Sequence, residues 1–134
     1  MIKLIVGAKG SGKTKMMIEM INEAAQEASG CIVCIEKGMK STYNVKNSVR
    51  IIDADDYAIR GYNMFYGFFM GILAGNYDIQ EVYVDGILKI GDNDVAGFAV
   101  MLDQIEELCK ENLKVVFTVS TDPDNLSEEI KKYL

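Results

Sequence analysis

The nine residues GAKGSGKTK, from Gly7 to Lys15, directly follow the apolar run IKLIV at Ile2–Val6. The apolar run is typical of a buried β-strand, and the residues after Lys15 show helical periodicity. Glycines within the stretch permit positive φ angles, so successive backbone N–H groups can turn inward around one anion. The stretch therefore predicts a strand, a tight bend and a helix, with an anion site at the bend.

Four more apolar runs follow, separated by segments with helical periodicity. The predicted strands are Ile2–Val6, Cys31–Glu36, Val49–Asp53, Glu81–Asp85 and Lys114–Ser120. Strands that alternate with helices over short connections favour a parallel sheet. We expect one α/β domain spanning residues 1–134, a three-layer sandwich in which helices cover both faces of a mainly parallel sheet of about five strands.

The helical segments have recognisable ends. The first ends before Gly30, and the second extends from Asp55 to about Ala74. Asn93 or Asp94 is expected to cap the third. Its inward face is predicted to carry Phe98, Met101, Leu102, Ile105 and Leu108. In the tail, Asp122 and Pro123 are expected to begin a helical turn, with Leu126, Ile130 and Tyr133 facing inward.

Composition excludes several classes of partner. The chain carries a net charge of −6 and no basic run, which argues against a nucleic-acid surface. Its most apolar segment, MFYGFFMGILA, is too short to span a bilayer. No secretory leader is recognisable, and the three cysteines form no disulfide pattern. We therefore expect a cytoplasmic protein with no membrane span.

The bend fits a known motif in full. Gly7, Gly12, Lys13 and Thr14 satisfy the pattern GxxxxGK[ST], between a predicted strand and a predicted helix. In this motif and its order of strands and helices, the chain resembles the P-loop NTPase superfamily. The resemblance implies a cofactor, Mg²⁺ with ATP or another nucleoside triphosphate. Lys13 would bridge the terminal phosphates, and Thr14 would ligate Mg²⁺. The expected nucleotide-binding residues of the bend are Gly7, Ala8, Lys9, Gly10, Ser11, Gly12, Lys13, Thr14 and Lys15.

A carboxylate that ends another apolar strand should complete such a site. Asp85 in EVYVDG has this position, and the resemblance implies that it holds Mg²⁺ as the Walker B aspartate. The alternative is an aspartate that only begins a turn, because Asp-Gly is a common turn pair.

The equipment for hydrolysis is incomplete. Many ATPases of this superfamily place a glutamate directly after the Walker B aspartate, where this chain has Gly86. Substitute bases are expected at other strand ends, at Glu36 or Asp53, although a solvated acid is the alternative for each. Ser120 could sense the γ-phosphate if the last strand lies beside the first. With Arg50 and Arg60 as its only arginines, the chain also lacks the arginine cluster of kinases that close a lid.

A predicted strand order follows from these features. The run VVFTV is continuously apolar, as a central strand should be, so we expect Lys114–Ser120 between the P-loop strand and the Asp85 strand. This order is that of the RecA-like division. The layout also resembles its thymidine-kinase-like branch, including an extended connector after the second strand.

The stretch GYNMFYGFFMGILAGNY, from Gly61 to Tyr77, carries apolar and aromatic residues on nearly every face. It is either a fully buried helix or a contact with a second copy of the chain or another protein. The Cys31-x-x-Cys34 pair is expected to be buried in its strand, because residues three apart in a strand point to opposite faces.

Three functions are compatible with the sequence. The first is a minimal Mg²⁺–ATP-binding protein that hydrolyses ATP slowly and is completed by a partner or an oligomer, with Lys13, Asp85 and Glu36 as catalytic residues. The second is a small-molecule kinase that uses Glu36 or Asp53 as base. The third is a nucleotide-responsive binding module without turnover.

Overall fold

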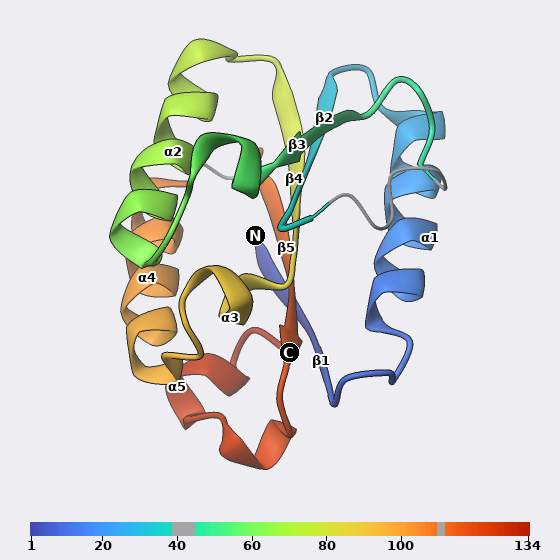
Figure 1. Ribbon diagram of the computed structural model, residues 1–134. Coiled ribbons are helices and arrows are strands. Elements are labelled where there is room, and N and C mark those ends of the chain that lie inside the picture. The colour runs from blue at the N-terminus through green and yellow to red at the C-terminus, as the bar shows by residue number, and fades with distance from the viewer. Residues whose placement is uncertain (39–44, 110–111) are drawn as a thin grey trace.

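Five parallel strands form the centre of the computed structural model, which describes residues 1–38, 45–109 and 112–134 (Figure 1). They lie side by side in the order β1-β5-β4-β2-β3. All five strands were predicted, with small differences in where some of them begin and end. Their bounds are β1 Ile2–Gly7, β2 Cys31–Glu36, β3 Arg50–Asp53, β4 Ile79–Asp85 and β5 Lys114–Ser120.

The last strand in the sequence is a central strand of the sheet. β5 pairs with β1 on one side and with β4 on the other, as its continuously apolar run predicted. Residues from Val115 to Val119 are all buried. Because side chains alternate along a strand, Val115 and Phe117 enter the core on one face and Val116 enters the core on the other.

Helices cover the two faces unequally (Figure 1). One face is covered by α1 (Lys13–Glu27), whose Met17 and Ile21 are fully buried against the sheet. The other face carries a larger core, in which Phe98 packs edge-on against Phe117 with ring centroids 5.7 Å apart. The helices on this face are α2 (Tyr62–Gly75), α3 (Ile87–Ile90), α4 (Val95–Leu108) and α5 (Glu128–Lys131). The three-layer α/β architecture is therefore confirmed.

The predicted second helix, from Asp55 to about Ala74, is wrong in its first third. The structure has a 3₁₀ turn, η2 (Ala54–Tyr57), and α2 begins only at Tyr62. Ala58 and Gly61 both have positive φ angles, 53° and 79°, which a continuous helix does not allow. Two separate elements therefore replace the expected helix.

There are two smaller differences. Leu108 is 57% exposed rather than buried, at the residue where α4 ends. The four-residue α3 was not predicted, since such a short segment shows no periodicity. The cap predictions hold: Asp94 accepts a hydrogen bond from the Gly97 amide, and Asp122 caps the 3₁₀ turn η3 (Pro123–Asn125).

The aromatic segment that contains α2 is not fully buried. Phe65 and Phe69 enter the core, whereas Met64 is 50% exposed and Tyr77 fully exposed. The fully buried alternative is therefore wrong, and a contact with a second copy or a partner protein stays a prediction. Among the helices in the described ranges, none is long and apolar enough to cross a membrane. The predicted connector after β2 includes residues 39–44, which lie outside the described residues.

Candidate functional site

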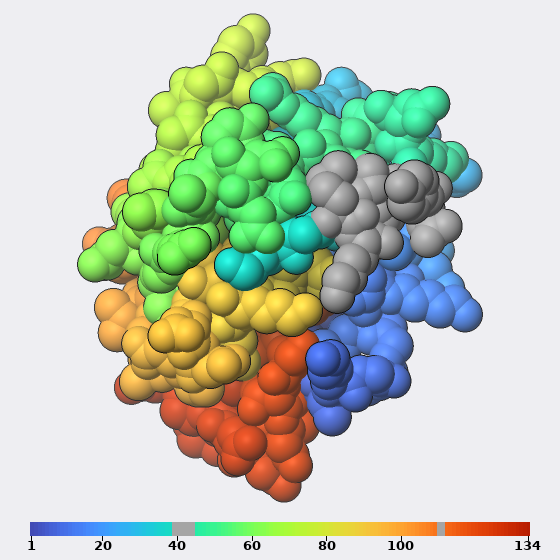
Figure 2. Space-filling model, in the orientation of Figure 1, coloured from blue at the N-terminus to red at the C-terminus, as the bar shows by residue number. Residues whose placement is uncertain are grey.

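The carboxyl ends of the strands gather most of the predicted site residues at one edge of the sheet. The blue segment after β1, the cyan end of β2, the golden segment after β4 and the orange-red end of β5 meet on one face of the molecule (Figure 2). A pocket of about 240 Å³ lies there. It is lined by Lys9, Gly10, Lys13, Thr14, Glu36, Lys37, Gly38, Asp85, Gly86, Lys89 and Ser120.

The glycine-rich bend has the backbone that its composition predicts. Gly10 and Gly12 have φ angles of 85° and 89°, in the left-handed region that glycine adopts without strain. A Cβ at Gly7 would lie 2.5 Å from the Ser11 Oγ, so a larger residue would displace that side chain. The Ser11 amide donates to the Ala8 carbonyl at 3.1 Å, which closes the turn.

The N-terminus of α1 opens into this pocket without a cap. Gly12 is the N-cap residue, no side-chain hydrogen bond caps the helix, and its first turn holds no acidic residue. The chain does cap other helices, as Asp94 does for α4. The free amide groups and the helix dipole therefore leave a local positive potential at the bend, which suits a phosphate.

Lys13 lies at the base of the pocket. Its side chain is 8% exposed, and Nζ donates to the Ala8 carbonyl at 3.0 Å. Burial lowers the pKa of the Lys13 ammonium, while the carboxylate of Asp85 acts in the opposite direction and Lys89 lowers the pKa further. An anion bound beside Lys13 would favour its charged form.

A chain of hydrogen bonds joins α1 to the ends of β4 and β5. The Thr14 hydroxyl donates to Asp85, with distances of 3.2 Å to Oδ2 and 3.4 Å to Oδ1. The buried Thr118 hydroxyl donates to Asp85 Oδ1 at 2.5 Å and accepts from the Gly86 amide at 2.8 Å. The orientation of the Asp85 carboxylate is thus fixed from two sides.

The side-chain oxygens of Thr14 and Asp85 suit Mg²⁺ better than they suit a metal whose ligands all come from the protein. Magnesium is usually bound by one or two protein oxygens together with substrate phosphates and water. Thr14 and Asp85 place such oxygens side by side. No cluster of three or more acidic, histidine or cysteine side chains that could hold a metal occurs within residues 1–38, 45–109 and 112–134.

A second carboxylate lies beside Asp85 at the edge of the sheet. Glu36 ends β2 and pairs in register with Asp85 of β4, and its side chain is only 3% exposed. Together with burial, these two carboxylates raise the pKa of the Cys34 thiol to about 12. Glu36 also lines the charged pocket, where an acid could accept a proton.

The other predicted residues occupy distinct places. Ser120 is exposed at the end of β5, pairs in register with Gly7 and lines the pocket. Lys15 is exposed on α1, and it is not among the lining residues. Ala8, Ser11 and Gly12 shape the bend and also lie outside the lining.

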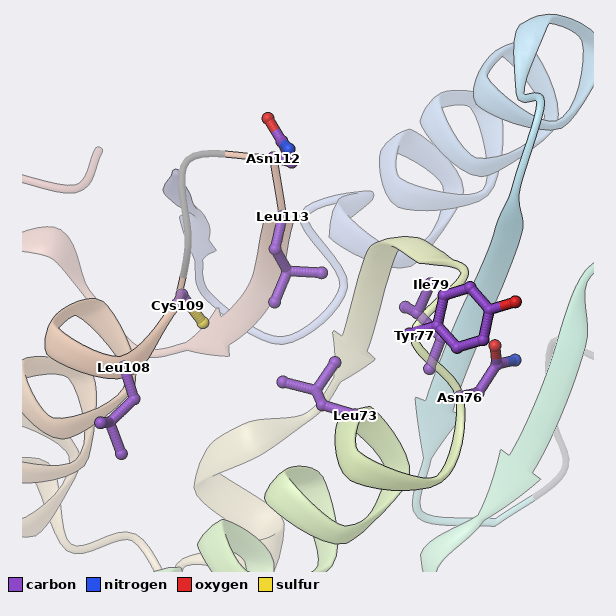
Figure 3. A pocket seen from close by; sticks show the side chains of 8 residues that line it. All are labelled: Leu73, Asn76, Tyr77, Ile79, Leu108, Cys109, Asn112 and Leu113. Atoms are coloured by element: carbon purple, nitrogen blue, oxygen red, sulfur yellow. The ribbon is translucent and has the colours of Figure 1, made fainter.

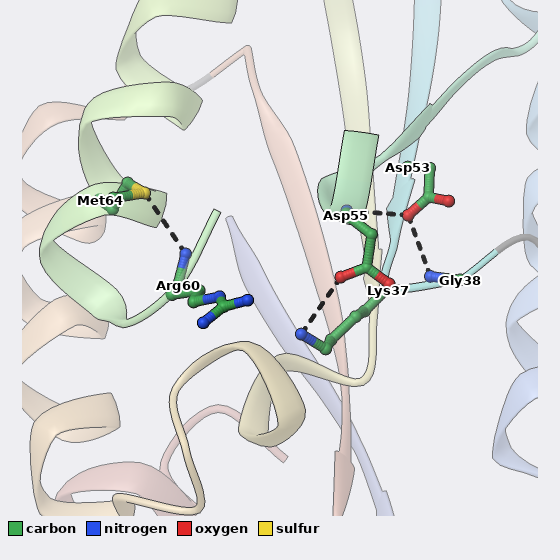
Figure 4. Close-up of polar contacts among 6 residues, drawn as sticks. All are labelled: Lys37, Gly38, Asp53, Asp55, Arg60 and Met64. Carbon is green, nitrogen blue, oxygen red and sulfur yellow. Dashed lines mark hydrogen bonds and ion pairs between the residues drawn. The ribbon is translucent and has the colours of Figure 1, made fainter. Parts of the chain in front are cut away.

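Asp53, the other expected base, has a structural role (Figure 4). Its Oδ1 accepts the amide of Gly38 at 3.0 Å and that of Asp55 at 2.9 Å, so it links the end of β2 to the turn after β3. Asp53 does not line the pocket. Lys37, which does, forms an ion pair of 3.2 Å with Asp55.

A larger pocket of about 320 Å³ lies at the opposite edge of the sheet, near the starts of β4 and β5 (Figure 3). Leu73, Ile79 and Leu113 point into it, and none of the lining residues that the structure describes carries a charge. Volume alone would single out this pocket, but its chemistry does not suit a phosphate. We therefore assign the candidate site to the smaller, charged pocket.

Sequence reasoning missed three residues of the site. Thr118 was assigned to an apolar run, and its contact with Asp85 arises from strand pairing that no local pattern shows. Lys89 lies on the unpredicted α3. Lys37 directly follows Glu36 at the end of a predicted strand, a position that could have been recognised from the sequence.

Comparisons with known proteins give a fold rather than a family. No protein-family model matches the sequence, and no curated protein matches it significantly. The structure matches that of the pCW3 conjugation coupling protein TcpA, determined in its monomer form with ATPγS, with a TM-score of 0.55 and 13% sequence identity. The match covers 98% of this chain and 46% of that one, so this chain spans less than half of its length. The chain thus has an α/β fold like that of part of a coupling protein whose structure contains a nucleotide.

Proposed function

We propose that this chain binds ATP, or another nucleoside triphosphate, with Mg²⁺ at the pocket around residues 7–14. The observation that carries the proposal is the uncapped N-terminus of α1 beside Lys13, with Thr14 and Asp85 adjacent. Backbone amides, a lysine and two hard oxygen donors are the groups that a magnesium–triphosphate complex requires.

The charges around the pocket support this proposal. In the part of the chain that the structure describes, four lysines and two carboxylates line the pocket. One of these lysines, Lys37, is paired with Asp55 outside the lining, which leaves an excess of one positive charge. The whole chain has the opposite sign, with a net charge of −6. A local positive field in an acidic protein favours a small anion over an extended polyanion such as nucleic acid.

Each polar group has a distinct role in the proposed complex. The amides of the bend and Lys13 would hold the phosphates, and Thr14 and Asp85 would hold Mg²⁺, which neutralises phosphate charge. Glu36, buried next to Asp85, is the group that could orient a water molecule and accept its proton. Ser120, which also lines the pocket, could hydrogen-bond the terminal phosphate.

Hydrolysis is expected to be slow in the isolated chain. Gly86 occupies the position directly after Asp85 and has no side chain to activate water. Neither arginine lines the pocket among the described residues, so a positive charge for the transition state would come from lysines or from a partner. A small-molecule kinase is less well supported, since Asp53 is engaged with two backbone amides outside the pocket.

Titration calorimetry with Mg²⁺–ATP tests the proposal. Lys13→Ala should weaken binding about 10- to 100-fold, because a charge-assisted hydrogen bond contributes roughly 1.5–3 kcal/mol. Lys3→Ala is the matched control: it removes the same charge from an exposed position on β1 outside the pocket. Phosphate release by wild type and Glu36→Gln then measures turnover. Equal affinity of wild type and Lys13→Ala would contradict the proposed site.

A further inference from the structure

Lys89 lies at the pocket proposed for the nucleotide, although it belongs to none of the motifs. It lies on α3, four residues after Asp85, and lines the same pocket as Lys13. Its aliphatic chain passes beside Gly86: a Cβ at that position would lie 3.5 Å from the Lys89 Cδ and 3.9 Å from its Cγ. The side chain thus follows the backbone turn that begins at Asp85.

The backbone that carries Lys89 is firmly held. Its amide donates to the Gly86 carbonyl at 3.0 Å, and the Gly86 amide donates to Thr118 at 2.8 Å. The other residues of α3, namely Ile87, Leu88 and Ile90, are buried in the core, and Lys89 alone of this helix is exposed. The core therefore fixes the helix and leaves its lysine at the pocket.

Lys89 has a charge that the described residues do not neutralise with an ion pair. The ion pairs found within residues 1–38, 45–109 and 112–134 involve the lysines Lys37, Lys114, Lys131 and Lys132. Lys89 instead lines the same pocket as another cation, Lys13. Two ammonium groups that line one pocket repel each other unless an anion lies between them.

The position of α3 indicates which part of a nucleotide Lys89 would meet. α1, which presents the bend and Lys13, covers one face of the sheet, while α3 packs on the other face (Figure 1). Asp85 lies between them at the edge of the sheet. A triphosphate held by the bend and by a metal at Asp85 would therefore extend its terminal phosphate toward α3.

We propose that Lys89 binds the γ-phosphate and makes the pocket discriminate a nucleoside triphosphate from a diphosphate. This inference rests on the proposed nucleotide site and adds a recognition residue to it. Arginine commonly supplies a positive charge at this phosphate in P-loop enzymes. Here Arg50 and Arg60 are absent from the described lining, and Lys89 takes that place from within the chain.

Calorimetry on the full chain with Mg²⁺–ATPγS and Mg²⁺–ADP distinguishes the two proposals. Lys89→Gln should lower the affinity for ATPγS about 10- to 100-fold and change that for ADP by less than about twofold. Lys89→Arg should keep the preference for the triphosphate, and Lys3→Gln should bind both nucleotides as wild type does.

Four outcomes would overturn the inference. An equal loss of both affinities in Lys89→Gln would show only a general effect of charge, and unchanged binding would show no contact. If wild-type protein binds neither nucleotide, the proposed function itself is wrong. If wild type binds ATPγS and ADP equally, the nucleotide site stands, but discrimination by Lys89 is refuted.

Discussion

Replacing Thr118 by valine tests whether the buried hydroxyl fixes the magnesium side of the pocket. Valine has nearly the same shape, so the substitution removes one oxygen and leaves the packing of β5 in place. That oxygen donates to Asp85 Oδ1 at 2.5 Å and accepts from the Gly86 amide at 2.8 Å. The variant therefore changes hydrogen bonding at a site that is only 1% exposed.

The expected loss of stability follows from the two bonds. Gly86 is buried, so its amide would be left without a partner, which costs about 1–3 kcal/mol. Asp85 is only partly buried and can turn toward water, so the loss of its bond should add less than about 1 kcal/mol. Together, these two terms predict that the free energy of unfolding falls by about 1–4 kcal/mol.

Urea denaturation measures this change in stability as a shift of the denaturation midpoint, provided that the m-value stays the same. Thr118→Ser is the control, because it keeps the hydroxyl and loses one buried methyl group. That loss should lower the free energy of unfolding by about 1 kcal/mol. Thr118→Val should also weaken the Mg²⁺-dependent part of ATP binding, since Asp85 would lose its fixed orientation. A Thr118→Val protein as stable as wild type, with unchanged Mg²⁺ dependence, would refute the reasoning.

Two further predictions concern packing and thiol chemistry. Gly91→Ala should destabilise the protein by about 1–3 kcal/mol, because its Cβ would lie 2.0 Å from the ring of Tyr62. Gly67→Ala, at an open position within α2, should stabilise the protein by about 0.5–1 kcal/mol. If urea denaturation showed that both variants change the free energy of unfolding in the same direction, this reasoning would be contradicted. Cys34, whose pKa is raised to about 12, should stay unmodified by iodoacetamide at pH 8 in the native protein and react only after unfolding. Mass spectrometry that finds native Cys34 alkylated would show that its thiol is neither buried nor electrostatically suppressed.

The parts of the fold that the sequence predicts correctly are those with local causes. The strand positions follow from apolar runs, and the central place of β5 follows from a run that is apolar on both faces. Local chemistry also indicates the caps at Asp94 and Asp122. The bend at residues 7–14 is recognisable because its glycines and lysine lie close together in one short stretch of the chain.

The remaining features depend on contacts between distant residues. Thr118 is one polar residue in an apolar strand, and only the pairing of β4 with β5 brings its hydroxyl to Asp85. Lys89 reaches the pocket because the turn at Gly86 directs a short helix back over the sheet edge. The break before α2 arises at Ala58, which adopts a left-handed conformation that its residue type does not predict.

The two neighbouring carboxylates explain why the pocket needs so many cations. Glu36 and Asp85 end adjacent strands in register, and placing two negative charges together at a partly buried edge is unfavourable. The backbone dipole of α1 and the lysines compensate for these charges, and a magnesium ion at Thr14 and Asp85 would do so more strongly. In the proposed complex, phosphate and metal would therefore support each other: the metal would neutralise Asp85, while the phosphates would neutralise Lys13 and Lys89. On this reasoning neither component alone would compensate all of the charges in the pocket.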